Sequence, residues 1–229
     1  LGRLAAHDAG ALATALGGDT TPVRLDTTDE VLASRTQLLT DYQNAAYAEH
    51  YSAFVQKIRR RVSARSLPDG EAFVRAVALT LGRLMASKDE YEVARLYADD
   101  KFLQRIKQQF AGDFTMHFHL APPMLPGRDA SGRPKKRQFG PWVMSVYKLL
   151  RRMKGLRGTP FDPFGYFPER RLERRLIQDY RTLVESIVDR LDQHNLGLAI
   201  ELARAASDIA GYGPVKTASV ASYQSRLPV

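Results

Sequence analysis

Hydrophobic residues recur every three or four positions over most of this chain, which is the spacing of amphipathic α-helices. The longest such series runs from residue 31 to residue 62. Thr27 or Thr28 can cap its start, and the next residues, Asp29 and Glu30, lie where a helix favours negative charge. The pattern therefore predicts one long amphipathic helix that ends near Ser63.

The same periodicity predicts further helices along the rest of the chain. Asp89 can cap one of them, Pro168 opens another, and Asp192 or Asn195 starts a third. The expected helices cover residues 73–84, 91–97, 102–110, 142–150, 168–191, 196–203 and 217–227.

One short stretch has the period of a β-strand instead. In residues 114–120 apolar side chains alternate with polar ones, which predicts a half-buried strand with His117 and His119 on its polar face. The turn signature of residues 129–132 can close a hairpin after it. We therefore expect a mainly α fold, a helical domain with one small β element (a hairpin or short sheet) near residues 114–120.

Composition shifts near the start of the chain. The first sixteen residues are small, apolar and alanine-rich, and residues 17–22 (GGDTTP) are typical of a linker. We expect residues 1–22 to be the tail of a preceding domain with its linker, and residues 23–229 to form the helical domain.

The overall composition limits the possible classes of protein. With 229 residues and 44% hydrophobic content, the chain can form one sizeable core. No apolar run reaches the roughly 18 residues of a membrane span, so no membrane association is expected. There is no cysteine, which excludes disulfides, a cysteine nucleophile and cysteine-ligated zinc or iron–sulfur clusters within this chain, and fits a cytoplasmic location.

Positive charge is concentrated in one region. The net charge is +9, and residues 128–157 contain ten Lys and Arg residues against a single acid, Asp129. Such a patch suits acidic proteins, polyanions or phosphorylated cofactors. Its members make up the predicted partner- or anion-binding patch: Arg133, Lys135, Lys136, Arg137, Lys148, Arg151, Arg152 and Lys154.

Aromatic residues lie among these cations, at Phe139, Trp142 and Tyr147, as in many nucleic-acid-binding surfaces. Trp142 and Tyr147 also fit the apolar stripe of the expected helix, and we favour a core position for both. We likewise expect the aromatic residues of the loop at 159–166 to pack against the core.

Two further groups of residues are candidates for chemistry. His117 and His119 could supply two ligands of a zinc site, but nothing places a third nearby, and a structural or surface pair is the favoured interpretation. Charged residues cluster between Lys88 and Asp100, and a solvated, salt-bridged helix face is favoured over a network that orders the helix against a neighbouring domain. No dinucleotide, Walker, serine-hydrolase or zinc-protease motif is present, and no catalytic residue is predicted.

Six strings, in the same order along the chain, resemble the C-terminal region of long, fused indolepyruvate ferredoxin oxidoreductases. They are KDEYEVARLY (88–97), HFHLAPP (117–123), FGPW (139–142), LRGTPFDPFGY (156–166), ERRLERRLI (169–177) and GYGPVK (211–216). The resemblance covers roughly residues 38–216, and the opening GRLAAHD resembles the segment after that family's third catalytic-type domain.

The resemblance implies a whole enzyme that oxidatively decarboxylates an aryl or branched 2-oxo acid on thiamine diphosphate. Electrons would pass through iron–sulfur clusters to ferredoxin, the acyl group would pass to coenzyme A, and the full enzyme would be a homodimer. This chain has no thiamine signature and no cluster cysteines, so it is expected to bind none of these cofactors. It would be a C-terminal accessory domain without catalytic residues, whose partners are the remaining domains of the same polypeptide.

Three functional hypotheses follow. The first is an assembly domain of such an oxidoreductase, whose basic patch docks an acidic ferredoxin or coenzyme A. The second is a basic, helical nucleic-acid-binding module. The third is a self-contained enzyme that uses His117, His119 and the charged cluster of residues 88–95.

Overall fold

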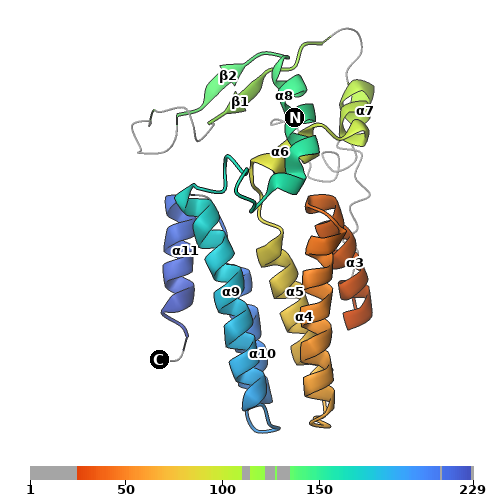
Figure 1. Ribbon diagram of the computed structural model, residues 1–229, viewed down its shortest axis with the longest axis vertical. Helices are drawn as coiled ribbons and strands as arrows, with labels where there is room; N and C mark the ends of the chain where they lie inside the picture. The colour runs from red at the N-terminus through yellow and green to blue at the C-terminus, as the bar shows by residue number, and fades with distance from the viewer. Residues whose placement is uncertain (1–24, 110–113, 122–126, 128–134, 212, 228–229) are drawn as a thin grey trace, which may run out of the picture. The chain divides into compact units, whose positions relative to one another are not determined.

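The computed structural model describes residues 25–109, 114–121, 127, 135–211 and 213–227. The described part is mainly helical with one two-stranded antiparallel sheet, which confirms the predicted fold class (Figure 1). Within it, no helix has the length and apolar character needed to cross a membrane. The elements are α3 (Thr28–Tyr42), α4 (Ala45–Ser63), α5 (Gly70–Met85), α6 (Glu90–Tyr97), α7 (Asp100–Gln109), β1 (Phe118–Leu120), β2 (Arg137–Phe139), α8 (Val143–Arg152), the 3-10 helix η1 (Met153–Leu156), α9 (Pro168–Asp189), α10 (Leu196–Ala205), the 3-10 helix η2 (Ala206–Asp208) and α11 (Pro214–Gln224).

The chain divides into two compact units. We call residues 25–92 and 153–229 the bundle unit, and residues 93–152 the hairpin unit. The chain thus leaves the bundle unit early in α6 and returns to it at η1. The predicted tail and linker, residues 1–22, lie outside the described residues.

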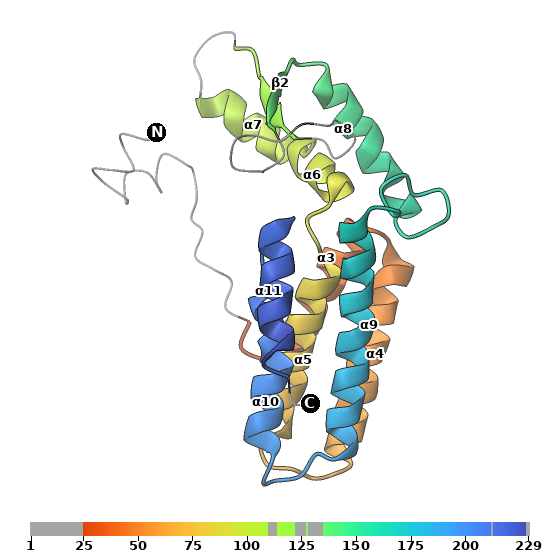
Figure 2. The ribbon, with the colours of Figure 1, turned by 90° about the vertical axis from the view of Figure 1, so that its left-hand side faces the viewer.

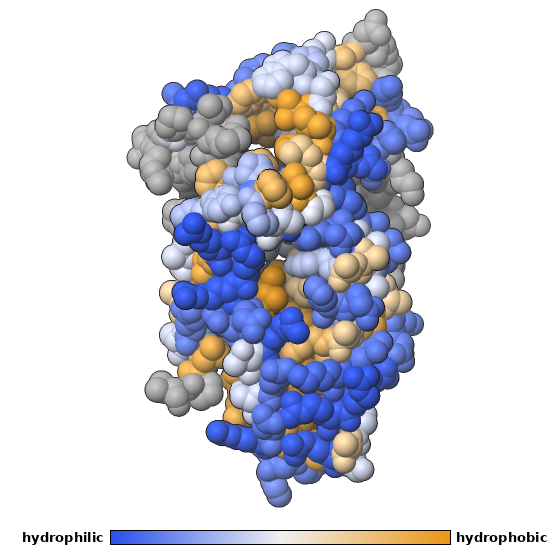
Figure 3. Space-filling model, in the orientation of Figure 1, coloured by the Kyte–Doolittle hydropathy of each residue, from blue (hydrophilic) through white to orange (hydrophobic). Residues whose placement is uncertain are grey.

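The bundle unit is organised around α5, which packs against α3, α4, α9 and α10. Figures 1 and 2 show these long helices running side by side, with α11 beside α10. An apolar residue lies on every side of α5, so it is buried almost throughout, whereas its neighbours bury one stripe each. On the face shown in Figure 3, hydrophilic residues cover most of the bundle surface and hydrophobic ones show in smaller areas between them.

The predicted single helix over residues 28–63 is wrong, because the chain breaks between α3 and α4. Gln43 leaves helical geometry, and the Asn44 side-chain oxygen accepts a hydrogen bond from the Tyr47 amide at 2.8 Å. Asn44 therefore caps a new helix, a role that asparagine fills well. The predicted cap at Thr27 is confirmed, and Glu30 completes a capping box with it.

The hairpin unit has its own small core. Strand β1 pairs with β2 so that Phe118 lies opposite Phe139 and His119 opposite Gln138. Phe118 then packs with Val143 and Tyr147 of α8, with Ala94 of α6 and with Ala98 directly after that helix. The strand is shorter than the predicted 114–120. The predicted alternation holds from Met116 to Leu120, with Phe118 buried and His117 and His119 exposed, but it fails at Phe114, which is exposed. The turn expected at 129–132 lies outside the described residues.

In the aromatic loop before α9, fewer aromatic side chains are buried against the core than predicted. Phe164 is buried, but Phe161 and Tyr166 are 81% and 59% exposed. The Asp162 carboxylate accepts hydrogen bonds from the amides of Gly158 and Phe164, and the Tyr166 hydroxyl donates to the Pro160 carbonyl. The loop is thus held by its own polar contacts, and only one aromatic side chain is needed to anchor it.

Candidate functional site

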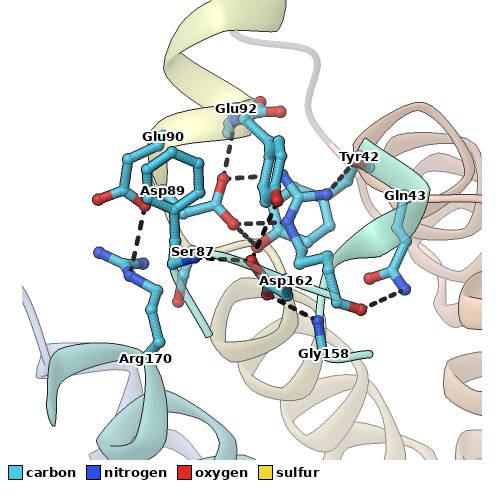
Figure 4. Close-up of polar contacts among 12 residues, drawn as sticks. Tyr42, Gln43, Ser87, Asp89, Glu90, Glu92, Gly158, Asp162 and Arg170 are labelled. Carbon is cyan, nitrogen blue, oxygen red and sulfur yellow. Dashed lines mark hydrogen bonds and ion pairs between the residues drawn. The ribbon is translucent and has the colours of Figure 1, made fainter. Parts of the chain in front are cut away.

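A buried ion pair lies at one end of the bundle unit. Arg157, just after η1, donates two hydrogen bonds to the Asp89 carboxylate, at 2.5 Å from Nε and 2.7 Å from Nη2 (Figure 4). The Asp89 side chain is 3% exposed and that of Arg157 is 10% exposed. The same carboxylate accepts the Glu92 amide at 2.8 Å, so Asp89 caps α6 as predicted and also holds the segment that follows α5.

Two tyrosines enclose this ion pair. The Arg157 guanidinium carbon lies 3.6 Å from the centroid of the Tyr42 ring, and the Tyr42 hydroxyl donates to Asp89 at 3.2 Å. The ring centroid of Tyr91 lies 5.2 Å from the same guanidinium carbon, and the Tyr91 hydroxyl donates to Asp162 at 3.0 Å. Burial, reinforced by the neighbouring carboxylates, raises the pKa of both hydroxyls above the ordinary value, so both stay protonated as donors.

The prediction that the charged residues after Lys88 form a solvated face is therefore wrong for its buried members. Asp89 and Glu92 are only 4% and 8% exposed. The partner of Asp89, Arg157, is 68 residues away in the sequence, so the short spacing rules applied to the helix could not identify it.

A second charged chain runs from α6 to α11 in the same unit. Glu173 of α9 accepts hydrogen bonds from Arg170 and from Lys216, both at 2.5 Å. The Arg170 Nε atom also lies 3.7 Å from a carboxylate oxygen of Glu90. Figure 4 marks this ion pair with a dashed line. Burial raises the pKa of Glu90, and the nearby Arg170 cation opposes that shift. Two carboxylates, Glu173 and Glu90, thus share the two cations Arg170 and Lys216.

Two cavities flank Glu173 in the bundle unit. The smaller, of about 210 Å³, is walled by Tyr42, Tyr47, Tyr91 and Phe164 together with the Asp89–Arg157 ion pair. The larger, of about 240 Å³, lies among the end of α5, the segment after it, α9 and the turn before α11. Its lining residues are Arg83, Leu84, Ala86, Ser87, Lys88, Glu173, Leu176, Ile209, Ala210, Gly211 and Lys216.

The predicted basic patch is divided by the structure. Arg133 lies outside the described residues. Lys154 belongs to the bundle unit and donates to the backbone carbonyls of Thr40 and Asp41. In the hairpin unit, Arg151 donates to the Ala98 carbonyl at 2.9 Å. The other members of the patch in the described part of the hairpin unit are exposed: Lys135, Lys136, Arg137, Lys148 and Arg152.

The exposed side of α8 carries apolar residues beside these cations. Trp142, directly before the helix, is 61% exposed, and Val146 and Leu149 are 40% and 58% exposed. Their spacing of four and three residues places them on one stripe. Lys148 and Arg152 follow along the same exposed side, whereas Tyr147 is buried and its pKa is raised to about 12 by burial and by Tyr97.

The expected core position of Trp142 is therefore wrong, and that of Tyr147 is confirmed. The Trp142 ring contacts Phe139 at 6.0 Å between centroids and otherwise faces outward. Because α8 begins only at Val143, the indole lies in the preceding turn, outside the stripe that packs on Phe118.

The histidine pair shows no site around it in the described residues. His117 and His119 lie on the exposed side of the strand segment in the hairpin unit. No group of three His, Cys, Asp or Glu residues in the described part of the chain could hold a metal ion. The enzyme hypothesis combined these histidines with the charged cluster of residues 88–95. Residues 88–92 of that cluster belong to the bundle unit, and Arg95 belongs to the hairpin unit.

The fold and these surfaces define a mainly helical, two-unit protein whose polar centre is a buried ion pair. The chain belongs to the family described as a family of unknown function, DUF6537, whose model matches residues 28–228. No curated protein and no solved structure matches this chain.

Proposed function

We propose that this chain is the C-terminal accessory region of a fused, cytoplasmic 2-oxo acid ferredoxin oxidoreductase, and that it contributes a docking surface for the acidic ferredoxin. In this proposal the remaining domains carry thiamine diphosphate, the iron–sulfur clusters and the coenzyme A site. The six strings quoted above support the family assignment. The chain's own contribution would be to assemble with those domains and to guide the electron acceptor.

One observation carries the docking role: the exposed stripe of Trp142, Val146 and Leu149 beside the cations Lys148 and Arg152. Interface centres are enriched in tryptophan and other apolar residues, and charged residues around them select the partner. A cationic rim attracts an acidic protein over a distance and raises its association rate, most strongly at low salt. The exposed Lys135 and Lys136 of the adjacent segment add to this field.

The experiment uses the intact polypeptide that contains this chain. Lys135, Lys136 and Arg137 are changed to glutamine in one variant, and Trp142 is changed to alanine in a second. At low ionic strength we expect the charge variant to raise the KM for ferredoxin several-fold, with the difference disappearing as salt is added. The Trp142 variant should raise KM about tenfold or more at any salt concentration, since an interface tryptophan often contributes 2 kcal/mol or more.

A matched control removes positive charge elsewhere. Arg171 and Arg175 lie on the exposed side of α9, so changing both to glutamine lowers net charge without touching the α8 surface. This variant should leave the KM for ferredoxin unchanged. If all three variants keep the original KM at low salt, the docking role is wrong; if the KM for coenzyme A rises instead, the patch serves that cofactor.

A nucleic-acid-binding role is the second candidate, and the exposure of Trp142 favours it. An indole that is 61% exposed near several cations can stack on a nucleic-acid base. Filter binding of single-stranded RNA and DNA against salt tests this role. Affinity that falls steeply with salt and is lost on Trp142→Ala supports it, and no binding at low ionic strength rules it out.

A further inference from the structure

The larger cavity of the bundle unit gathers cations from three separate segments. Arg83 comes from the last turn of α5, Lys88 from the segment that follows it, and Lys216 from the first turn of α11. The only acid among its lining residues is Glu173. Positive charge therefore exceeds negative charge around a space of about 240 Å³.

The acid in this cavity is already neutralised. Glu173 accepts hydrogen bonds from Lys216 and Arg170, and Arg170 also pairs with Glu90, so these two cations balance two carboxylates. Within the described part of the chain, no carboxylate pairs with Arg83 or Lys88, and both residues are exposed. The charge on these two side chains therefore has no internal counterpart among the described residues.

The position of Lys88 is fixed by its neighbour. Asp89 is held by Arg157 and by the Glu92 amide, and its own amide donates to the Ser87 carbonyl at 2.9 Å. Lys88 lies between these two anchored residues, so its backbone is held at the edge of the cavity. A cation held in this way needs less ordering when it binds a ligand than one on a loose loop.

The smaller cavity differs from the larger one in how its polar groups are paired. Its polar groups already satisfy one another, because Asp89 binds Arg157 and Asp162 binds Tyr91 and two backbone amides. It has the features of a structural centre. The larger cavity, by contrast, is lined by charged donors that are not all paired among the described residues. This arrangement suggests a ligand-binding site.

We propose that the larger cavity binds a small molecule through its phosphate group, with Arg83 and Lys88 as the main contacts and Lys216 as a third. A phosphate dianion gains about twice the Coulomb energy of a monovalent anion from the same cations. Lysine binds phosphate as a point charge and arginine through two parallel N–H groups. The volume lies below the roughly 300–1,000 Å³ of drug-sized pockets, so it suits a phosphate on a small organic group.

The test uses the full 229-residue chain and inorganic pyrophosphate as the probe, titrated by isothermal calorimetry at constant ionic strength set with chloride. We expect saturable binding at one site. The double variant Arg83→Gln, Lys88→Gln should bind at least tenfold more weakly, which corresponds to about 1.4 kcal/mol. Both side chains are exposed, so the variant should keep the urea unfolding midpoint of the parent.

The control is again Arg171→Gln with Arg175→Gln, which removes the same charge from the outer side of α9. It should bind pyrophosphate as the parent does. The proposal is overturned if the control loses as much affinity as the cavity variant, since binding would then follow net charge alone. It is also overturned if the parent chain shows no binding at millimolar pyrophosphate.

This inference does not depend on the docking role. Arg83 and Lys88 lie in the bundle unit, so the double variant should leave the KM for ferredoxin unchanged in the intact enzyme. Conversely, Trp142 lies in the hairpin unit, so Trp142→Ala should leave pyrophosphate binding unchanged. Each proposal can therefore fail while the other stands.

Discussion

Arg157 is the residue on which most of the polar order of the bundle unit depends. Its guanidinium binds both oxygens of Asp89, covers the Tyr42 ring and donates to the Tyr42 carbonyl. Its own carbonyl accepts from the Gln43 side chain at 3.3 Å, as Figure 4 shows. The residue thus joins the end of α3, the start of α6 and the loop before α9.

Removing this guanidinium should strongly destabilise the protein. Arg157→Met keeps most of the side-chain volume but leaves the Asp89 carboxylate buried without its counter-charge. Breaking a buried pair in this way costs about 3–5 kcal/mol. We expect a loss of that size in the free energy of unfolding, measured by urea denaturation followed by circular dichroism.

Arg171→Met is the matched control, because Arg171 is exposed on α9 and its side chain makes no hydrogen bond or ion pair with the described residues. It should change the free energy of unfolding by no more than about 0.5 kcal/mol. Equal and small effects of the two substitutions would show that Asp89 finds water or another partner when Arg157 is absent.

At the scale of single elements, periodicity predicted helices well and predicted their interruptions poorly. The apolar series from Val31 to Val62 continues through Asn44, so the hydrophobic pattern gives no sign of a break. The signal that could have shown it is local: asparagine is a preferred helix cap and a weak helix former. Thr27 was recognised as a cap because an apolar series starts after it, and Asn44 was missed because one continues past it.

The polar centre could be predicted only in part for a related reason. Asp89 was recognisable as a helix cap from sequence, because its hydrogen bond to Glu92 spans three residues. Its pairing with Arg157 was not recognisable, because no spacing rule links residues that far apart. The run of cations from 128 to 157 looked like one surface, yet Arg157 and Lys154 turned inward to backbone and carboxylate groups of the bundle unit.

The Asn44 cap gives a prediction for this break between helices. Asn44→Ala removes the oxygen that accepts the Tyr47 amide and should lower the free energy of unfolding by about 1 kcal/mol. Asn44→Asp keeps an acceptor at the same position and should cost only a few tenths of that amount. Urea unfolding of the three proteins measures both values. Equal losses for alanine and aspartate would mean that the cap does not set the start of α4.

At the scale of the whole chain, two cores of unequal size coexist. The bundle unit buries side chains of α5 together with those of α3, α4, α9, α10 and α11, whereas the hairpin unit buries Phe118, Val143 and Tyr147 with two alanines. Hydrophobic stabilisation grows with the apolar area removed from water, so the smaller core provides less of it. Its strands are three residues each, and such short ladders contribute few hydrogen bonds.

Local opening should therefore require less free energy in the hairpin unit than in the bundle unit. Native-state hydrogen exchange measures this directly, because amides in a less stable cooperative unit exchange through partial opening. We expect the amides of β1, β2 and α8 to report a lower opening free energy than those of α5. Phe118→Ala should lower the hairpin values further, by up to about 3–5 kcal/mol or until that unit is open, and leave the α5 values unchanged.

Leu81→Ala in α5 is the reciprocal variant, since Leu81 is fully buried in the bundle core. It should lower the opening free energy of α5 amides by about 2–5 kcal/mol. If Phe118→Ala lowers α5 protection by as much as it lowers that of β1, the two units unfold as one and the small core is supported by the large one. Separate responses would mean instead that the hairpin unit can open while the bundle unit, with its buried ion pair and the cavity proposed to bind phosphate, stays folded.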